Sequence, residues 1–341
     1  MNDRGSARRG VIAGGNWIID QVKLIDGWPA QDALASIVEE ETGNGGAPYN
    51  VLKNLARLGA AFPLEAVGLL GADQHGAAIL ADCRSHGIAT EQLRTVAGAA
   101  TSYTDVMTVK ATGRRTFFHR RGVNARLDVG DFNFGRTRAR WLHLGYLLLL
   151  DRLDQLSSAG LPRVVDVLQA ARRHGLLTSV DVVSEHADRF RQVVLPVLPH
   201  VDILFLNDYE AERLTGQSLR PAGRLDRAAV SEAAGQLASA GVRQWVVLHA
   251  PEGVLARAAG GAAVWQPAVR VPPESVAGAA GAGDALASGV LYGVHEGWPI
   301  ERALELGVCV AAASLAHPSC SGGVRPLAEC LELGRTLGWQ R

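Results

Sequence analysis

Lysine is scarce in this chain of 341 residues. Lys23, Lys53 and Lys110 are the only three, and the other 31 of the 34 basic residues are arginine. A phosphate-binding loop of the GxxxxGK[ST] type needs a lysine after its second glycine, and none of the three lysines has that setting. If the chain binds a nucleotide, it therefore holds the phosphates by another device.

Net charge is also lacking, because 34 acidic residues offset the 34 basic ones. Proteins that bind polyanions carry a basic face or tail, so the composition argues against a nucleic-acid partner. The apolar runs at 144–150 and 308–316 are far shorter than the roughly 18 residues of a membrane-spanning helix, and no apolar segment follows the arginines of residues 1–10. We therefore expect a cytoplasmic protein without a membrane partner.

Cysteine is rare as well, and its spacing is uninformative. The four cysteines form no CxxC pair, so the sequence indicates neither a zinc site nor a disulfide framework. Glycine, by contrast, is abundant: 39 of 341 residues, or about 11%, against roughly 7% in an average protein. The glycines therefore direct attention to turns and to backbone that a ligand can approach closely.

Two different patterns of predicted secondary structure divide the chain. From residue 141 onward, predicted strands such as 176–183 and 202–206 alternate with predicted helices, which is typical of βαβ units and a parallel sheet covered on both faces. The earlier segments 18–25, 101–109 and 115–119 instead alternate apolar and polar residues, as half-buried strands do. We expect these to form a small separate sheet, built from two pieces that are not adjacent in the chain.

A glycine-rich segment at 278–285 reads G-A-A-G-A-G-D-A and precedes an apolar predicted helix. Small residues let a ligand approach the backbone, and the start of a helix presents unpaired N–H groups that favour phosphate. Asp284 would either cap the helix or, beside a phosphate, accept a proton from an attacking hydroxyl. The segment alone fits a small-residue turn as well as it fits a phosphate site.

A second candidate follows the predicted strand 202–206. Ligands of parallel sheets bind at the carboxyl ends of the strands, where Asn207 and Glu210 stand three residues apart at a helix start. Such a pair would hold water around Mg²⁺, which keeps several waters and uses few carboxylates. A plain capped helix start explains the same two residues.

Two N-terminal segments carry residue types suited to hydroxyl groups. Between the predicted strand 34–41 and a predicted helix, Gly45 and Gly46 expose backbone and Asn50 offers an amide. Asp20 follows the first strand, and its carboxylate would accept hydrogen bonds from a polyol. Ordinary loop chemistry explains the first segment equally well, and an exposed edge-strand carboxylate explains the second.

Taken together and in this order, these segments resemble the ribokinase-like (PfkB) family of carbohydrate kinases. The resemblance covers about residues 11–331. Its parts are a fructokinase-like N-terminal signature (45–51 and 54–59), the core of the C-terminal signature (281–284), the NxxE motif (207–210), the first-strand substrate segment (15–20), and the lid hairpin with its following loop (113–117 and 122–125).

The resemblance implies an α/β fold, a ribokinase-like three-layer sandwich with a mostly parallel central sheet. Residues 1–341 would form one kinase domain, with a small β-sheet lid formed from about 17–42 and 101–122. The implied reaction is transfer of the γ-phosphoryl group of ATP to a hydroxyl of a small fructose-like or ribose-like sugar.

The resemblance also implies a role for each candidate residue. Asp284 would be the general base. The remaining site residues would be Gly281, Ala282 and Gly283 as the anion hole, Asn207 and Glu210 as Mg²⁺ ligands through water, and Asp20, Gly45, Gly46, Asn50 and Asn124 as sugar-binding residues.

The chain departs from the family pattern at Gly278, Ala279 and Ala280, where the signature usually reads D-T-T. These positions help relatives to bind a monovalent cation, so we expect the rate to depend little on K⁺. Five arginines at 114–126 would suit a phosphorylated acceptor, although a role as solvated lid residues explains most of them equally well.

Three alternatives to a kinase of free sugars remain open at this stage. They are a nucleoside kinase, a sugar-phosphate kinase of the same fold, and a sugar-binding or nucleotide-binding protein with weak kinase activity. An exposed lid sheet favours cover by a second copy, so a homodimer through the lid is a further hypothesis.

Overall fold

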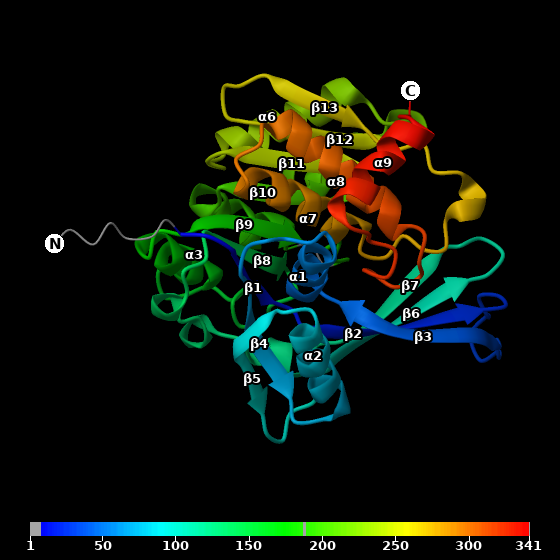
Figure 1. Cartoon of the computed structure of the whole chain (residues 1–341), viewed down its shortest axis with the longest axis horizontal. Coiled ribbons are helices and arrows are strands. Elements are labelled where there is room, and N and C mark those ends of the chain that lie inside the picture. Colours follow the sequence, from blue (N-terminus) through cyan, green and yellow to red (C-terminus); the bar gives the residue numbers. More distant parts are fainter. Residues whose placement is uncertain (1–7, 187–188, 341) are drawn as a thin grey trace.

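The computed structural model describes residues 8–186 and 189–340, and two sheets organise this part of the chain (Figure 1). The large sheet has the strand order β13-β12-β11-β10-β9-β8-β1-β4-β5. The second sheet has the order β3-β2-β6-β7 and projects from the body, to the right in Figure 1. The arrangement in two sheets, predicted from the two sequence patterns, is therefore confirmed.

The large sheet is built from β1 (Val11–Gly15), β4 (Leu64–Gly71), β5 (Ala89–Val96), β8 (Trp141–Leu147), β9 (Leu177–Val182), β10 (Ile203–Asn207), β11 (Trp245–Ala250), β12 (Gly253–Arg257) and β13 (Ala263–Pro267). All neighbours from β5 to β11 pair in parallel, and β12 and β13 add an antiparallel edge. The carboxyl ends of the parallel strands thus lie along one edge, where ligands of such sheets bind.

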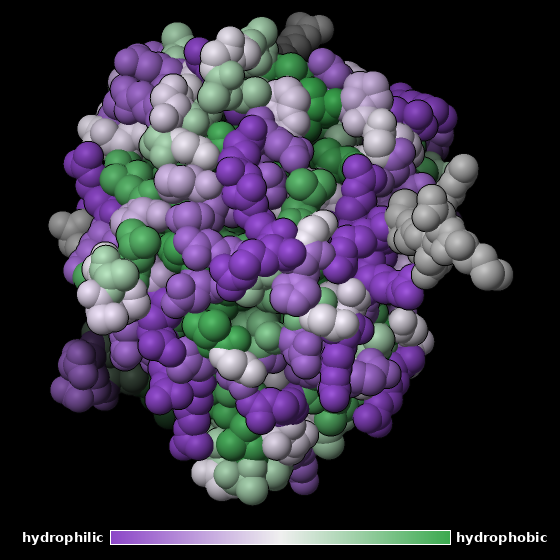
Figure 2. All heavy atoms as spheres, turned by 90° about the vertical axis from the view of Figure 1, so that its left-hand side faces the viewer, coloured by the Kyte–Doolittle hydropathy of each residue, from purple (hydrophilic) through white to green (hydrophobic). Residues whose placement is uncertain are grey.

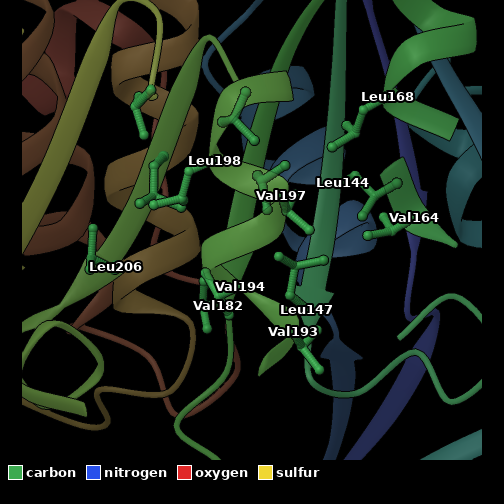
Figure 3. Packing of buried hydrophobic residues seen from close by; sticks show 14 of the residues in the cluster. Leu144, Leu147, Val164, Leu168, Val182, Val193, Val194, Val197, Leu198 and Leu206 are labelled. Carbon is green, nitrogen blue, oxygen red and sulfur yellow. The ribbon is translucent and has the colours of Figure 1, made fainter. Parts of the chain in front are cut away.

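Helices cover both faces of this sheet. They are α1 (Ala47–Arg57), α2 (Gln74–Ser85), α3 (Val164–Arg173), α4 (Phe190–Val193), α5 (Asp208–Thr215), α6 (Arg227–Ser239), α7 (Ala282–His295), α8 (Ile300–Ser314) and α9 (Leu327–Leu337). Two apolar clusters fill the two interfaces. In one of them Leu144 of β8 lies beside Val164 and Leu168 of α3 (Figure 3), and each fully buried side chain contributes about 1.5–3 kcal/mol.

One helix crossing brings α7 to its place. A Cβ atom on Gly289 of α7 would lie 2.7 Å from the Cα of Gly307 in α8, so only glycine allows the two helices to approach this closely. The close approach lets α7 run through the interior with its first turn at the carboxyl edge of the sheet. That first turn carries the glycine-rich segment predicted to bind phosphate.

The second sheet, which we call the lid sheet, consists of β2 (Ile18–Ile25), β3 (Ile37–Gly45), β6 (Ser102–Val109) and β7 (Arg115–Arg120). Its central strand β2 pairs antiparallel with β3 and parallel with β6, and β6 and β7 form a hairpin. Alternate side chains therefore face in opposite directions, one set toward the body and one set away from it.

Some local predictions were wrong. Residues 43–45 belong to β3 and not to a loop, because they pair in register with residues 18–20 of β2. The apolar run 190–198 favours a helix in the sequence, but α4 ends at Val193 and 3₁₀ turns follow, because Pro196 and Pro199 cannot continue an α-helix. The sequence analysis also did not predict β5 and α9.

The face of the body opposite the lid sheet is mostly hydrophilic, with hydrophobic residues in small separate groups (Figure 2). Within residues 8–186 and 189–340, no helix is long and apolar enough to cross a membrane.

Candidate active site

A cavity of about 820 Å³ lies between the lid sheet and the carboxyl edge of the large sheet. Its volume is within the roughly 300–1,000 Å³ of small-molecule sites. The lid sheet contributes Ile18, Asp20, Thr104, Arg115, Phe117 and His119 to its wall, and the body contributes, among others, Gly46, Asn50, Tyr146, Asp181, Asn207, Glu210, Gly281, Ala282, Gly283 and Asp284.

The start of α7 forms one wall of the cavity. Gly281, the N-cap, has φ +70°, and a Cβ atom there would lie 2.6 Å from the Cβ of Cys320. The Ala282 N–H donates to the Ala279 carbonyl at 3.3 Å, and no side chain caps the helix. The first turn of this 14-residue helix thus presents backbone N–H groups and the positive end of its dipole to the cavity.

Asp284 occupies the third position of α7 and is 3% exposed. Its Oδ2 accepts hydrogen bonds from Asn50 Nδ2 and from the Tyr146 hydroxyl, both at 2.7 Å. Its Oδ1 is buried and has no hydrogen-bond partner in the described part of the chain. Burial raises the pKa of Asp284 to about 6, although both hydrogen bonds lower it. One oxygen is therefore fixed, and the other is free to accept a proton near neutral pH.

A second layer of hydrogen bonds orients these partners. Asn44 Nδ2 donates to Asn50 Oδ1 at 2.6 Å and to Ser321 Oγ at 2.8 Å, which leaves the amide group of Asn50 to face Asp284. The sequence analysis missed Asn44 and Tyr146. The position of Tyr146 at the carboxyl end of a buried strand was a usable signal, whereas nothing local distinguishes Asn44 from an ordinary turn residue.

Asp20 lies on β2 and faces the cavity from the lid sheet, so it is not an exposed edge residue. It pairs in register with Gly43 of β3 and Thr104 of β6. A Cβ atom on Gly45 would lie 2.3 Å from its Oδ1, so this glycine makes room for the carboxylate. Burial, and then the charge of Asp284, raise the pKa of Asp20 to about 7, although the Cys320 thiol donates to its Oδ2 at 3.5 Å.

Asn207 and Glu210 form the N-terminal cap of α5. Asn207 Oδ1 accepts from the Glu210 N–H, and the Glu210 carboxylate accepts from the Asn207 N–H, both at 2.8 Å. Ser184 Oγ also donates to Glu210. Burial raises the pKa of Glu210 to about 7. Asn207 and Glu210 therefore cap α5, as the simpler interpretation of the sequence predicted, and both also line the cavity.

The carboxylates on this side suit a hydrated divalent cation. Burial, followed by the charges of Asp284 and Glu210, raises the pKa of Asp181, which lines the same cavity. No cluster of three or more His, Cys, Asp or Glu side chains arranged to hold a metal ion occurs among the residues described. Hard oxygen donors without a closed cage fit Mg²⁺, which keeps most of its waters.

Two other predicted residues occupy different positions. Gly46, the N-cap of α1 with φ +87°, lines the cavity, and a Cβ atom there would lie 1.9 Å from the Asn16 carbonyl oxygen. Asn124 does not line the cavity. Its Nδ2 donates to the Trp17 carbonyl at 2.9 Å, so it fastens the backbone that leads into β2.

A carboxylate with a free oxygen beside a helix start that favours phosphate is an arrangement suited to phosphoryl transfer to a hydroxyl. The chain belongs to the pfkB family of carbohydrate kinases, whose sequence pattern matches residues 15–326. It is thus a phosphotransferase with an alcohol group as acceptor, and the family uses ATP. Both the family and the ribokinase-like α/β fold inferred from the sequence are confirmed.

Individual relatives span several acceptors. The chain is 23% identical to the 5-dehydro-2-deoxygluconokinase of Geobacillus thermodenitrificans over 290 residues, which cover 83% of this chain and 81% of the relative. Its fold is similar to that of the Arabidopsis thaliana ribokinase solved with ribose and ATP (TM-score 0.76, 21% identity, 96% and 99% of the two chains). It is also similar to the Burkholderia thailandensis nucleoside kinase solved with inosine (TM-score 0.73, 17% identity, 97% and 100%).

The burial of Asp20 predicts a measurable cost in stability. Its folded pKa, about 7, lies above its ordinary value of 3.8, so the ionised form destabilises the folded state. The penalty is complete above pH 7 and disappears as the pH falls toward 4. We expect Asp20→Asn to raise the free energy of unfolding at pH 8 by about 1–2 kcal/mol, and by progressively less at lower pH.

Urea denaturation at pH 8, 7 and 5.5 measures this difference. Glu91→Gln, which removes an exposed carboxylate on β5, serves as the control and should change the free energy of unfolding by less than about 0.5 kcal/mol at each pH. A stabilisation by Asp20→Asn that is the same at all three pH values would show that the charge of Asp20 is not its cause.

Proposed function

We propose that this kinase transfers the γ-phosphoryl group of ATP to a hydroxyl of a small sugar, with Asp284 as the general base. The observation that carries the proposal is the free Oδ1 of Asp284, buried in the cavity wall on the first turn of α7. A pKa of about 6 leaves this carboxylate ionised at neutral pH and able to accept a hydroxyl proton.

The backbone at Gly281, Ala282 and Gly283 would stabilise the transferred phosphoryl group. These residues line the cavity directly before Asp284, and glycine is needed at 281 by the contact with Cys320. Phosphoryl transfer depends mainly on positioning and on stabilisation of negative charge, both of which a helix start supplies without a lysine. The three lysines of the chain are accordingly absent from the cavity wall.

The acceptor would lie between Asp284 and the lid sheet. Asp20 faces this space from β2, and Asn50 and Gly46 border it at the start of α1. Asp20 and Asn50 offer a carboxylate and an amide to sugar hydroxyls. Gly45 would leave room for the carboxylate of Asp20. Asn124 would hold in position the backbone at Trp17, which leads into β2.

Asn207 and Glu210 would hold Mg²⁺ through water, with Asp181 close by. Magnesium would neutralise charge on the phosphates of ATP when bound. Glu210 is oriented for this role by Ser184 and by the Asn207 backbone. At Gly278, Ala279 and Ala280 the chain offers no side-chain oxygen, and we propose that transfer proceeds without K⁺ at this loop.

A nucleoside acceptor is the second candidate. Phe117 lines the cavity from the lid sheet and offers a ring on which a base would stack, and one structural relative is a nucleoside kinase solved with inosine. The small polar wall formed by Asp20, Asn50 and Thr104 favours a sugar acceptor without a base instead. A panel of acceptors distinguishes the two.

Replacing the base tests the reaction directly. Asp284→Asn keeps the size and the hydrogen-bond geometry of the side chain but removes its ability to accept a proton. We expect acceptor-dependent release of ADP to fall by about 10²–10⁴-fold, measured by a coupled assay over a panel of hexoses, pentoses, sugar acids, sugar phosphates and nucleosides.

Asp166→Asn, which alters an exposed carboxylate on α3, is the matched control and should retain wild-type turnover. If no acceptor gives turnover above that of Asp284→Asn while a sugar still raises the melting temperature of the protein, the protein is a binding protein and the proposal is wrong.

The hydrogen bond from Tyr146 predicts a shift in pH dependence. This bond lowers the pKa of Asp284, so Tyr146→Phe raises that pKa. Because the base acts only when ionised, the acidic limb of the kcat profile should move to higher pH, and the ratio of variant to wild-type kcat should fall by about three- to tenfold between pH 8 and pH 6. Tyr292→Phe, on the far end of α7, should leave the profile unchanged. A Tyr146→Phe profile that moves to lower pH contradicts the assignment.

We propose that the lid sheet forms a homodimer through the face that turns away from the cavity. Trp28 and Phe118 stack there with ring centroids 6.2 Å apart, and they are 53% and 52% exposed. Ile37, 51% exposed, lies in the same hydrophobic groove. An apolar face of this kind on a projecting sheet favours cover by a second copy.

Sedimentation velocity at micromolar concentration tests the dimer. We expect the wild-type protein to sediment as a dimer and Phe118→Asp to sediment as a monomer, because a charge would have to be buried in the interface. Thr112→Asp, at the exposed hairpin tip between β6 and β7, should remain dimeric. A wild-type protein that is monomeric throughout would exclude this interface.

A further inference from the structure

Five arginines lie in or beside the β6–β7 hairpin, and only one of them lines the cavity. Arg114 and Arg126 are exposed, Arg120 lies over the ring of Tyr103, and Arg121 pairs with Asp151 and Glu185. Arg115, by contrast, lines the wall of the cavity. Alternation along β7 explains the difference, because residues 115, 117 and 119 face the body while residues 116, 118 and 120 face away.

Arg115 carries hydrogen-bonding capacity that the protein does not use. Its Nη1 is buried and has no hydrogen-bond partner, and its guanidinium forms no ion pair within residues 8–186 and 189–340. The side chain rests on the ring of Phe117, 5.8 Å from the centroid. A buried cationic donor without a partner is costly, so its presence at this position points to a partner that enters the cavity.

His119, two residues beyond Phe117 on the same face of β7, shows the same pattern. Its Nδ1 lies 3.0 Å from Thr104 Oγ1, whereas its Nε2 is buried without a partner in the described chain. Burial, and then the charge of Arg121, lower the pKa of His119 to about 4, so the ring is neutral at pH 7. Thr104 also forms a hydrogen bond with Asp20 that lowers the pKa of that carboxyl group, so its hydroxyl donates to Asp20 and the Nδ1–H of His119 donates to Thr104. In the neutral ring Nε2 is then an acceptor, and it offers a partner to a hydroxyl group in the cavity.

The carboxylates of the cavity occupy other parts of its wall. Asp284 belongs to α7 and Asp181 to the carboxyl edge of the large sheet, while Asp20 stands on β2 beside Thr104. Burial lowers the pKa of Arg115, and Cys320, which packs against Gly281, lies near its guanidinium. The two unpartnered nitrogens, Arg115 Nη1 and His119 Nε2, thus define the lid side of the acceptor space.

We propose that Arg115 forms an anion subsite, and that the acceptor of this kinase carries a carboxylate or phosphate group which this subsite holds. The inference rests on the proposed function and specifies its acceptor as an acidic sugar. The planar guanidinium of Arg115 would bind two oxygens of the anion, and His119 Nε2 would accept a hydrogen bond from a neighbouring hydroxyl of the acceptor. The sugar hydroxyl to be phosphorylated would then lie toward Asp284, at the opposite end of the acceptor.

Matched acceptors test this subsite. The probes are D-glucose, D-gluconate and D-glucose 6-phosphate, and D-fructose with its 1-phosphate and 6-phosphate, each tested for ADP release and, without nucleotide, for a rise in melting temperature. We expect the wild-type protein to prefer at least one anionic probe over its neutral counterpart by about tenfold or more in kcat/KM. A carboxylate preference and a phosphate preference identify which anion the acceptor carries.

Variants assign the preference to Arg115. Arg115→Gln should lower kcat/KM for the anionic probe by about tenfold to a hundredfold, mostly through KM, and abolish the rise in melting temperature. Values for neutral probes and KM for ATP should stay within about twofold, and Arg115→Lys should retain part of the preference. Arg114→Gln, which alters the exposed neighbouring arginine, is the matched control and should behave as the wild type.

The remaining outcomes decide between the two proposals. Preference for neutral probes, absence of any larger thermal shift with anions, equal losses for neutral and anionic probes in Arg115→Gln, or a rise in KM for ATP alone would each overturn the anion subsite. Turnover of neutral sugars only would leave the proposed kinase function intact. A thermal shift by an anionic probe that depends on Arg115, without turnover of any acceptor, would instead contradict the kinase function and support the subsite.

Discussion

The carboxylate of Asp284 is the group on which the arrangement of the cavity depends. Its two oxygens differ in their surroundings, since one accepts hydrogen bonds from Asn50 and Tyr146 and the other has no partner among the residues that the structure describes. The two donors come from α1 and from the end of β8, and the carboxylate itself comes from α7. Three elements must therefore pack correctly before this group is positioned. The Gly289–Gly307 approach, the buried faces of α1 and the parallel register of β8 serve that requirement.

Concentrating carboxylates in one cavity raises their pKa values together. Asp20, Asp181, Glu210 and Asp284 are all shifted upward, and in each case burial is the largest cause. Stability alone would disfavour such a set, because ionised groups are removed from water without cationic partners. A cation and a polyhydroxylated acceptor are the kinds of ligand that compensate. The lid sheet adds the complementary feature, an arginine and a histidine that each have a buried side-chain nitrogen without a partner in the described part of the chain.

Sequence reasoning succeeded where chemistry is local. The glycine-rich turn, the cap formed by Asn207 and Glu210, and the strand at residues 18–25 each follow from neighbouring residues, and all three are present in the structure. It failed where the environment is distant in the chain. Residues 43–45 were assigned to a loop although they pair with β2, and Tyr146 and Asn44 were missed because their partners lie 138 and 277 residues away.

The sequence by itself determined the family, the α/β class, the presence of two sheets and the residue types that would handle phosphate without lysine. Only the tertiary structure decided which side chains meet. It separated Arg115 from the four other arginines, because strand alternation and the packing of the lid sheet turn this one side chain inward. It also removed Asn124 from the cavity wall and added Tyr146 to it. The physical reason is that motif spacing fixes local conformation, whereas the burial and pKa of a group depend on elements that only the fold brings into contact.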